Sequence, residues 1–161
     1  MTLVEESHRY PDRVVGCVAS SGVVDARWNF PEFDELVSSA IADVGSCDAS
    51  LRNTTAAMER KFAAGKGGEL MMAFNSSNLI NATLGDDFWY GVADGAAMLD
   101  QYGHKSTLCE AIDIGAGASD DARIDALVSL YDEQYGAGFV GDCFYSSDCL
   151  KNISAGDASL L

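Results

Sequence analysis

The run from Arg13 to Ala19 is the part of this chain that most limits its fold. Its residues, Arg-Val-Val-Gly-Cys-Val-Ala, are apolar on both alternating faces and follow the breaker Pro11-Asp12. A strand with two apolar faces belongs inside a sheet that is covered on both sides. No other run in the chain can supply sheet partners, so the remaining residues are predicted to fold as helices.

Apolar residues recur at helical spacing through most of the remaining sequence, which predicts amphipathic helices. The first helix begins at an N-cap, Asn29, has Pro31 in its first turn and ends at Gly45. The other predicted helices cover residues 48–63, 70–74, 86–101 and 119–136, with Ser119 as N-cap and Gly103 and Gly136 as C-terminal glycines. The polar residues 75–83 are predicted to form a surface loop, and residues 137–161, rich in Gly, Ser and Cys, an irregular tail.

The charge of the chain excludes two classes of partner. Its 161 residues amount to about one domain, and 25 acidic against 10 basic residues give a formal net charge of −15. This charge repels the phosphates of nucleic acids and anionic lipid headgroups. No run reaches the ~18 apolar residues of a membrane span, so we predict neither a nucleic-acid nor a membrane partner.

Two features of the sequence indicate the cellular compartment in which the protein is made. Asn-x-Ser/Thr sequons occur at Asn53, Asn75, Asn81 and Asn152, where 6 Asn and 21 Ser or Thr predict about one by chance. The five cysteines lack CxxC spacing, which favours disulfides over a metal site. Together these features predict synthesis in the secretory pathway, with a signal peptide missing from this chain. Buried free thiols in a cytosolic helical protein are the alternative.

The motifs that could carry chemistry are weak. Residues 136–141 satisfy GxGxxG, but a dinucleotide site needs a strand before the motif and a helix after it. His8 and His104 are expected to be exposed, and the pairs Asp86-Asp87 and Asp120-Asp121 lie at helix starts, where the helix dipole explains them. We therefore predict no catalytic residue, cofactor or metal ion in this chain.

Three segments carry a resemblance to a known family. They are Tyr10-Pro11 with the strand and Ala19-Ser20-Ser21-Gly22-Val23-Val24-Asp25-Ala26; Ser46-Cys47-Asp48; and Tyr90-Gly91-Val92-Ala93-Asp94-Gly95-Ala96-Ala97-Met98-Leu99-Asp100-Gln101-Tyr102-Gly103 followed by Cys109. Over residues 8–112 the chain resembles the lysosomal Pro-Xaa carboxypeptidase family of serine peptidases. That family also includes a lysosomal dipeptidyl peptidase and the thymus-specific serine protease.

The resemblance implies a mainly α-helical fold, the cap (lid) domain of an α/β-hydrolase, with one core β-strand near the N-terminus. Residues 1–26 would belong to the hydrolase core, 27–136 to the cap and 137–161 to the tail. It also implies a disulfide between Cys47 and Cys109. Cys17 is expected to be buried and unpaired, and a local bridge between Cys143 and Cys149 stays open.

The function implied by the resemblance is that of a fragment. The triad order Ser, Asp, His of an α/β-hydrolase places the serine before Tyr10 and the other two residues beyond Leu161, so the chain is expected to be inert alone. The whole enzyme would be a lysosomal, vacuolar or extracellular exopeptidase acting on peptides with proline near one end, and the family allows a homodimer. A complete, acidic, non-enzymatic secreted domain that binds another protein is the alternative.

Overall fold

The computed structural model describes the chain in three parts, Asp12, residues 30–80 and residues 85–156. The run predicted as a strand, Arg13 to Ala19, lies outside the described residues. Across the parts that are described, the structure contains helices and no strand. The prediction of a mainly α-helical fold, like that of a cap domain, is thereby confirmed.

Contacts along the chain divide it into two compact units, Met1–Asp34 and Glu35–Leu161. In the first unit the backbone N–H of Phe33 donates to the carbonyl of Phe30 over 3.2 Å at the start of α2 (Pro31–Ala42). The second unit contains the remaining elements: α3 (Cys47–Lys61), the π-helix η1 (Phe62–Lys66), α4 (Gly67–Ala73), the 3-10 helix η2 (Ser77–Leu79), α5 (Asp86–Gln101), α6 (Lys105–Ile112), α7 (Asp120–Tyr135), the 3-10 helices η4 (Phe139–Gly141) and η5 (Cys143–Tyr145), and α8 (Ser147–Gly156).

The ends of α7 are set by local chemistry. Ser119 lies at the N-cap, where its hydroxyl oxygen accepts a hydrogen bond from the backbone N–H of Ala122 over 3.2 Å. Such a bond satisfies one of the N–H groups that the first turn leaves free. Gly136 follows the last turn with a φ of 90°, a value that favours glycine. The predicted helix limits, Ser119 and Gly136, are those of the structure.

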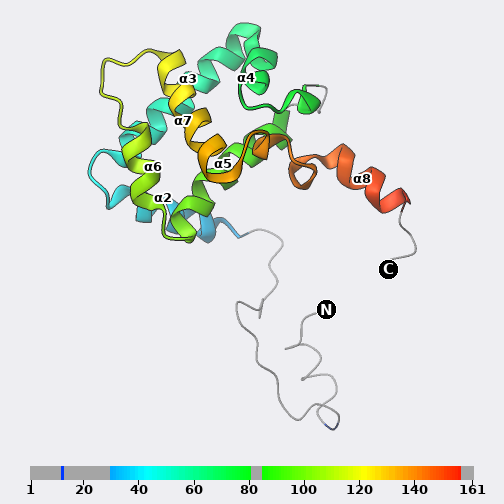
Figure 1. The fold of residues 1–161 in the computed structure, drawn as a ribbon. Coiled ribbons are helices and arrows are strands. Elements are labelled where there is room, and N and C mark those ends of the chain that lie inside the picture. The colour runs from blue at the N-terminus through cyan, green and yellow to red at the C-terminus, as the bar shows by residue number, and fades with distance from the viewer. Residues whose placement is uncertain (1–11, 13–29, 81–84, 157–161) are drawn as a thin grey trace. The chain divides into compact units, whose positions relative to one another are not determined.

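Three helices of the second unit, α3, α6 and α7, pack against one another, and Figure 1 shows α3 and α7 side by side. The core between the helices of this unit is aliphatic and aromatic. Its most deeply buried side chains include Met58, Leu70, Leu79, Phe88, Leu108, Ile112 and Ile124. Burial of each such side chain contributes roughly 1.5–3 kcal/mol to stability, so this unit has a core of its own.

Ion pairs join the end of α3 to the start of α7. The Arg60 guanidinium donates to both carboxylate oxygens of Asp120, over 2.8 and 2.7 Å, and Lys61 Nζ donates to Asp121 Oδ1 over 2.8 Å. Cys47, at the start of α3, forms a disulfide with Cys109 in α6. This is the pairing that the family resemblance implies.

A glycine allows α5 and α7 to approach closely. A Cβ atom at Gly95 would lie 2.7 Å from two ring carbons of Tyr131, closer than real Cβ contacts come. The Tyr131 hydroxyl donates to the carbonyl of Val92 over 2.6 Å, and its ring is 2% exposed. Gly95 is therefore needed for packing, and this hydrogen bond fixes the Tyr131 ring against α5.

The structure corrects the sequence-based prediction in three places. Residues 105–112, for which no helix was predicted, form α6 because Leu108 and Ile112 are buried in the core and Cys109 is disulfide-bonded. Within the segment predicted as a surface loop, η2 forms and Leu79 is buried. The tail predicted to be irregular contains η4, η5 and α8, stabilised by a disulfide between Cys143 and Cys149.

Candidate functional site

The acidic pairs at the helix starts form contacts between elements. Asp120 and Asp121 pair with Arg60 and Lys61, and hydrogen bonding to these cations holds the pKa of both carboxyl groups below its usual range. The Asp87 carboxylate instead accepts from the backbone N–H of Ser147 over 2.9 Å and from its hydroxyl over 2.6 Å. Asp87, Asp120 and Asp121 thus each join the start of a helix to another element.

The described histidine and the glycine motif both lie at helix ends. His104 is exposed at the N-terminus of α6, while His8 lies outside the described residues. Residues 136–141 follow a helix and form the turn into η4. Throughout the described ranges, no three His, Cys, Asp or Glu side chains lie together in a way that could hold a metal ion. In the same ranges, no helix is long and apolar enough to cross a membrane.

The second unit contains an open groove of about 560 Å³. It lies where α5, the end of α7 and residues 137–145 meet. Five aromatic rings line it: Tyr102, Tyr135, Phe139, Phe144 and Tyr145. The carboxylates of Asp94 and Asp142 also line it, and among the described lining residues none is basic. The groove is therefore aromatic and acidic.

Hydrogen bonds from tyrosines fix the wall of the groove. The Tyr145 hydroxyl donates to Asp94 Oδ2 over 2.6 Å, and the Tyr135 hydroxyl donates to the carbonyl of Gly95 over 2.7 Å. The rings of Tyr135 and Phe139 stack with their centroids 4.2 Å apart and an interplanar angle of 23°. Both hydrogen bonds attach the segment after residue 134 to α5, so the wall is preformed.

Burial keeps the groove tyrosines protonated. It raises the pKa of Tyr135 to about 12, with a further contribution from the charge of Asp94. The pKa of Tyr145 is also raised, first by burial and then by the hydrogen bond that its hydroxyl donates to Asp94. An ordinary tyrosine is already a neutral phenol at pH 7, and burial keeps these two neutral to higher pH, so the negative charge of the groove comes from its carboxylates.

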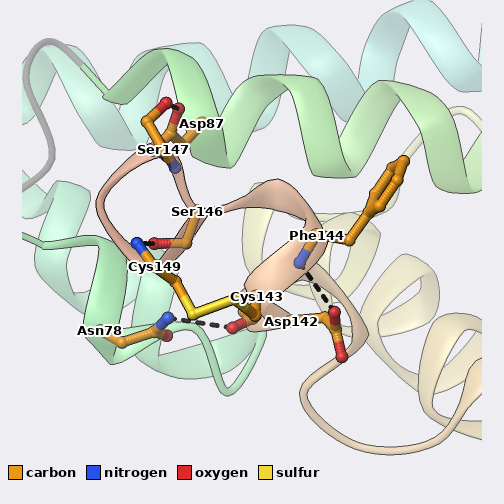
Figure 2. Close-up of a disulfide and its surroundings, with 9 residues drawn as sticks. Asn78, Asp87, Asp142, Cys143, Phe144, Ser146, Ser147 and Cys149 are labelled. Carbon is orange, nitrogen blue, oxygen red and sulfur yellow. Dashed lines mark hydrogen bonds between the residues drawn. A yellow bond between two sulfur atoms is a disulfide. The ribbon is translucent and has the colours of Figure 1, made fainter. Parts of the chain in front are cut away.

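The second disulfide supports the edge of the groove. Figure 2 shows Cys143 bonded to Cys149, with Asp142 beside it and the Phe144 ring extending away from the sulfur atoms. Asp142 Oδ1 accepts from the backbone N–H of Phe144 over 2.8 Å, which caps η5. Asn78 Nδ2 donates to the carbonyl of Gly141 over 2.9 Å and so connects this edge to η2.

The three sequon asparagines that the structure describes do not line the groove. Asn53 is exposed on α3, Asn75 is exposed between α4 and η2, and Asn152 is exposed on α8. Asn81 lies outside the described residues. Asn75 has a φ of 52°, a conformation that asparagine adopts more readily than most residues. The three described asparagines are thus accessible to a modifying enzyme.

No sequence pattern predicted this groove. Its aromatic residues at 135, 139, 144 and 145 come from the end of a helix and from the predicted irregular tail. Their density in a Gly- and Ser-rich segment is the sequence signal that could have found it, because aromatic rings in a tail of that composition need a surface on which to pack. The face of α5 on which these rings pack is set by the tertiary fold and cannot be read from this segment.

Comparison with known proteins identifies the class to which these helices belong. Residues 5–115 match the family model described as Serine carboxypeptidase S28, and the chain belongs to this family of serine peptidases. It is also 32% identical over 101 residues to a protein of Arabidopsis thaliana named "Probable serine protease EDA2". That match covers 63% of this chain and 19% of the Arabidopsis protein. No solved structure matches the chain.

Proposed function

We propose that this chain supplies the helical cap of a serine exopeptidase that acts on peptides with proline near one end. The observation that carries the proposal is the S28 family match over residues 5–115, which extends across most of the helical unit that begins at Glu35. Within the described residues this unit has the helical architecture of a cap and not the sheet of a hydrolase core. A cap of this kind covers the catalytic cleft and limits which peptides reach it.

In this proposal the chain contributes shape, and the catalytic groups come from other parts of the enzyme. No serine of the chain lies in the Gly-x-Ser-x-Gly context of a nucleophile elbow. The disulfide between Cys47 and Cys109 and the ion pairs between α3 and α7 hold the cap in one arrangement. A rigid cap supports selection by size and shape, because it excludes peptides that would require it to move. The partner is the peptide substrate of the whole enzyme, which we propose can form a homodimer.

A direct test is peptidase activity of the purified 161-residue chain. We expect no turnover of fluorogenic peptides with proline next to either end, because loss of all triad members leaves at most the contribution of substrate binding and oxyanion stabilisation. The matched control is a trypsin substrate that carries the same fluorophore, because its cleavage reports contaminating proteases. Turnover of the prolyl peptide that a serine-directed phosphonate blocks would contradict the proposal that the triad lies elsewhere.

The transcript gives an independent test of the same proposal. We expect the sequence upstream of Met1 to encode, in frame, a signal peptide and then Gly-x-Ser-x-Gly. An upstream sequence closed by a stop codon and lacking this motif would instead favour a complete, non-enzymatic binding domain.

We further propose that the chain is a glycoprotein of the secretory pathway, destined for the lysosome, the vacuole or the extracellular space. The two disulfides and the membership of the S28 family support the secretory pathway. The exposure of Asn53, Asn75 and Asn152 supports glycan attachment at these sequons, since a glycan needs a surface position.

Glycan occupancy is tested by removing each sequon at its Ser or Thr. Thr55→Ala, Ser77→Ala and Ser154→Ala are each expected to remove one glycan, seen as one step in gel mobility and as loss of the glycopeptide in mass spectra. Ser77→Thr and Ser154→Thr keep their sequons and are the matched controls. Identical mobility of the wild-type protein before and after enzymatic deglycosylation would contradict the proposal.

A further inference from the structure

The groove between α5 and residues 135–145 is lined by both aromatic rings and carboxylates. Its aromatic rings offer apolar faces, while Asp94 and Asp142 bring negative charge, and no described lining residue is basic. A volume of about 560 Å³ is within the usual range for small-molecule and peptide side-chain sites. These features point to a ligand that carries a positive charge and also has a flat or apolar surface.

The aromatic rings around Tyr145 pack edge to face, and part of the ring set is open to solvent. Tyr145 lies against Phe139 and Phe144, with ring centroids 5.1 and 5.2 Å away and steep interplanar angles. Phe144 is 63% exposed and Tyr102 is 66% exposed, so both side chains can contact a ligand at the surface. A cation over the face of such rings is attracted by their quadrupole, and a guanidinium also stacks on them.

The carboxylates can pair with the same cation. Tyr145 uses one oxygen of Asp94, but a carboxylate has about four acceptor positions, so Asp94 keeps acceptor capacity. Asp142 accepts one backbone N–H through Oδ1 and is itself exposed. A carboxylate pairs with a guanidinium through two parallel hydrogen bonds, which a lysine ammonium cannot form. Arginine therefore matches the groove better than lysine does.

We propose that this groove binds the guanidinium group of an arginine side chain. Asp94 and Asp142 supply the counter-charge, and Tyr102, Phe139 and Phe144 supply the rings. The family match ends at residue 115, so it includes Asp94 but none of the lining residues from Tyr135 onward. The inference concerns binding alone and does not rest on peptidase activity.

The test compares a cation with a neutral molecule of nearly the same shape. Nα-acetyl-arginine methylamide and Nα-acetyl-citrulline methylamide are titrated into the full chain, and binding is followed by calorimetry and by NMR shifts of the groove residues. We expect the arginine compound to bind at least ten times more tightly, because the neutral citrulline side chain cannot form charge-assisted hydrogen bonds to the carboxylates. Its affinity is also expected to fall with added salt.

Variants locate the site. Asp94→Asn keeps an oxygen that can accept from Tyr145, and Asp142→Asn keeps one that can accept from Phe144, so both variants are expected to fold and to bind arginine roughly tenfold more weakly. Phe144→Ala removes an exposed ring and is expected to weaken binding severalfold. Glu133→Gln is the matched control, since it removes one charge from an exposed position on α7 outside the groove.

The arginine and citrulline titrations and the variants together decide whether the groove binds a guanidinium group. Arginine binding that citrulline does not reproduce, and that Asp94→Asn, Asp142→Asn and Phe144→Ala weaken while Glu133→Gln does not, would support the inference. Equal affinity for the two compounds, no binding of either, or equal weakening by Glu133→Gln would overturn it. If Asp94→Asn does not fold, Asp142→Asn and Phe144→Ala decide the result, because both positions are exposed.

Discussion

Replacing Cys47 and Cys109 together with alanine is expected to lower the free energy of unfolding by about 4 kcal/mol. The two cysteines are separated by 62 residues, so their disulfide closes a large loop and removes much of the conformational entropy of the unfolded chain. The bond also secures α6, which has only eight residues. Urea unfolding of the double variant and the wild-type protein at the same pH measures the difference.

The second disulfide is the matched control for this prediction. Cys143 and Cys149 are separated by only 6 residues, so the same relation gives about 2 kcal/mol for their replacement with alanine. We therefore expect the Cys47 and Cys109 variant to lose roughly twice as much stability. Equal losses in the two double variants would show that loop size does not set the contribution of these bonds.

Raising the pH above about 10 is expected to destabilise the fold steeply. Burial raises the pKa of Tyr131 well above its ordinary value of 10.0, and it also raises that of Tyr135 and Tyr145. Above pH 10 the unfolded chain loses these phenolic protons while the folded chain keeps them. The unfolded state then binds fewer protons, so the free energy of unfolding falls as the pH rises, and the stabilisation is fully present only below pH 10.

Tyr131 alone is expected to contribute a slope of about 1.4 kcal/mol per pH unit in this range, and the two groove tyrosines add to it. Urea unfolding at several pH values from about 9 to about 11.5 measures the slope. Tyr131→Phe should lower the free energy of unfolding by about 1 kcal/mol at neutral pH, because the Val92 carbonyl loses its hydrogen bond. It should also remove the contribution of one titrating phenol from the alkaline slope.

A destabilised variant that keeps every phenol is the control for the alkaline effect. Val128 packs against the core from α7, and Val128→Ala should lower stability at every pH without changing the slope. An alkaline slope in Tyr131→Phe as steep as that of the wild-type protein would show that Tyr131 does not keep its proton in the folded state.

The sequence predicted the limits of α5 from its apolar spacing and those of α7 from its caps as well. The prediction for α5 was residues 86–101, and the structure has Asp86–Gln101. For α7 the predicted caps Ser119 and Gly136 lie where expected. Capping bonds and apolar spacing involve residues within a few positions of one another, so such helices can be identified from the sequence without the fold.

Helices that depend on distant partners were missed. Leu108 and Ile112 in α6 gain their burial from other helices, and the bond to Cys47 holds the segment in place. In α8 and the turns before it, the bridge from Cys143 to Cys149 and the cap at Asp142 stabilise a Gly- and Ser-rich segment that looks irregular from its composition. Tertiary contacts outweigh weak local preference in both places.

By itself, the sequence determined that the chain is helical, acidic and rich in cysteine, and that it resembles a serine peptidase family. Only the tertiary structure placed the Tyr145 hydroxyl 2.6 Å from Asp94, 51 residues away, and Tyr135 2.7 Å from the carbonyl of Gly95, 40 residues away. The groove is made by these distant pairs. The apolar spacing of each helix predicts which face is buried but not which other segment packs against it, so the groove could not be predicted from the sequence.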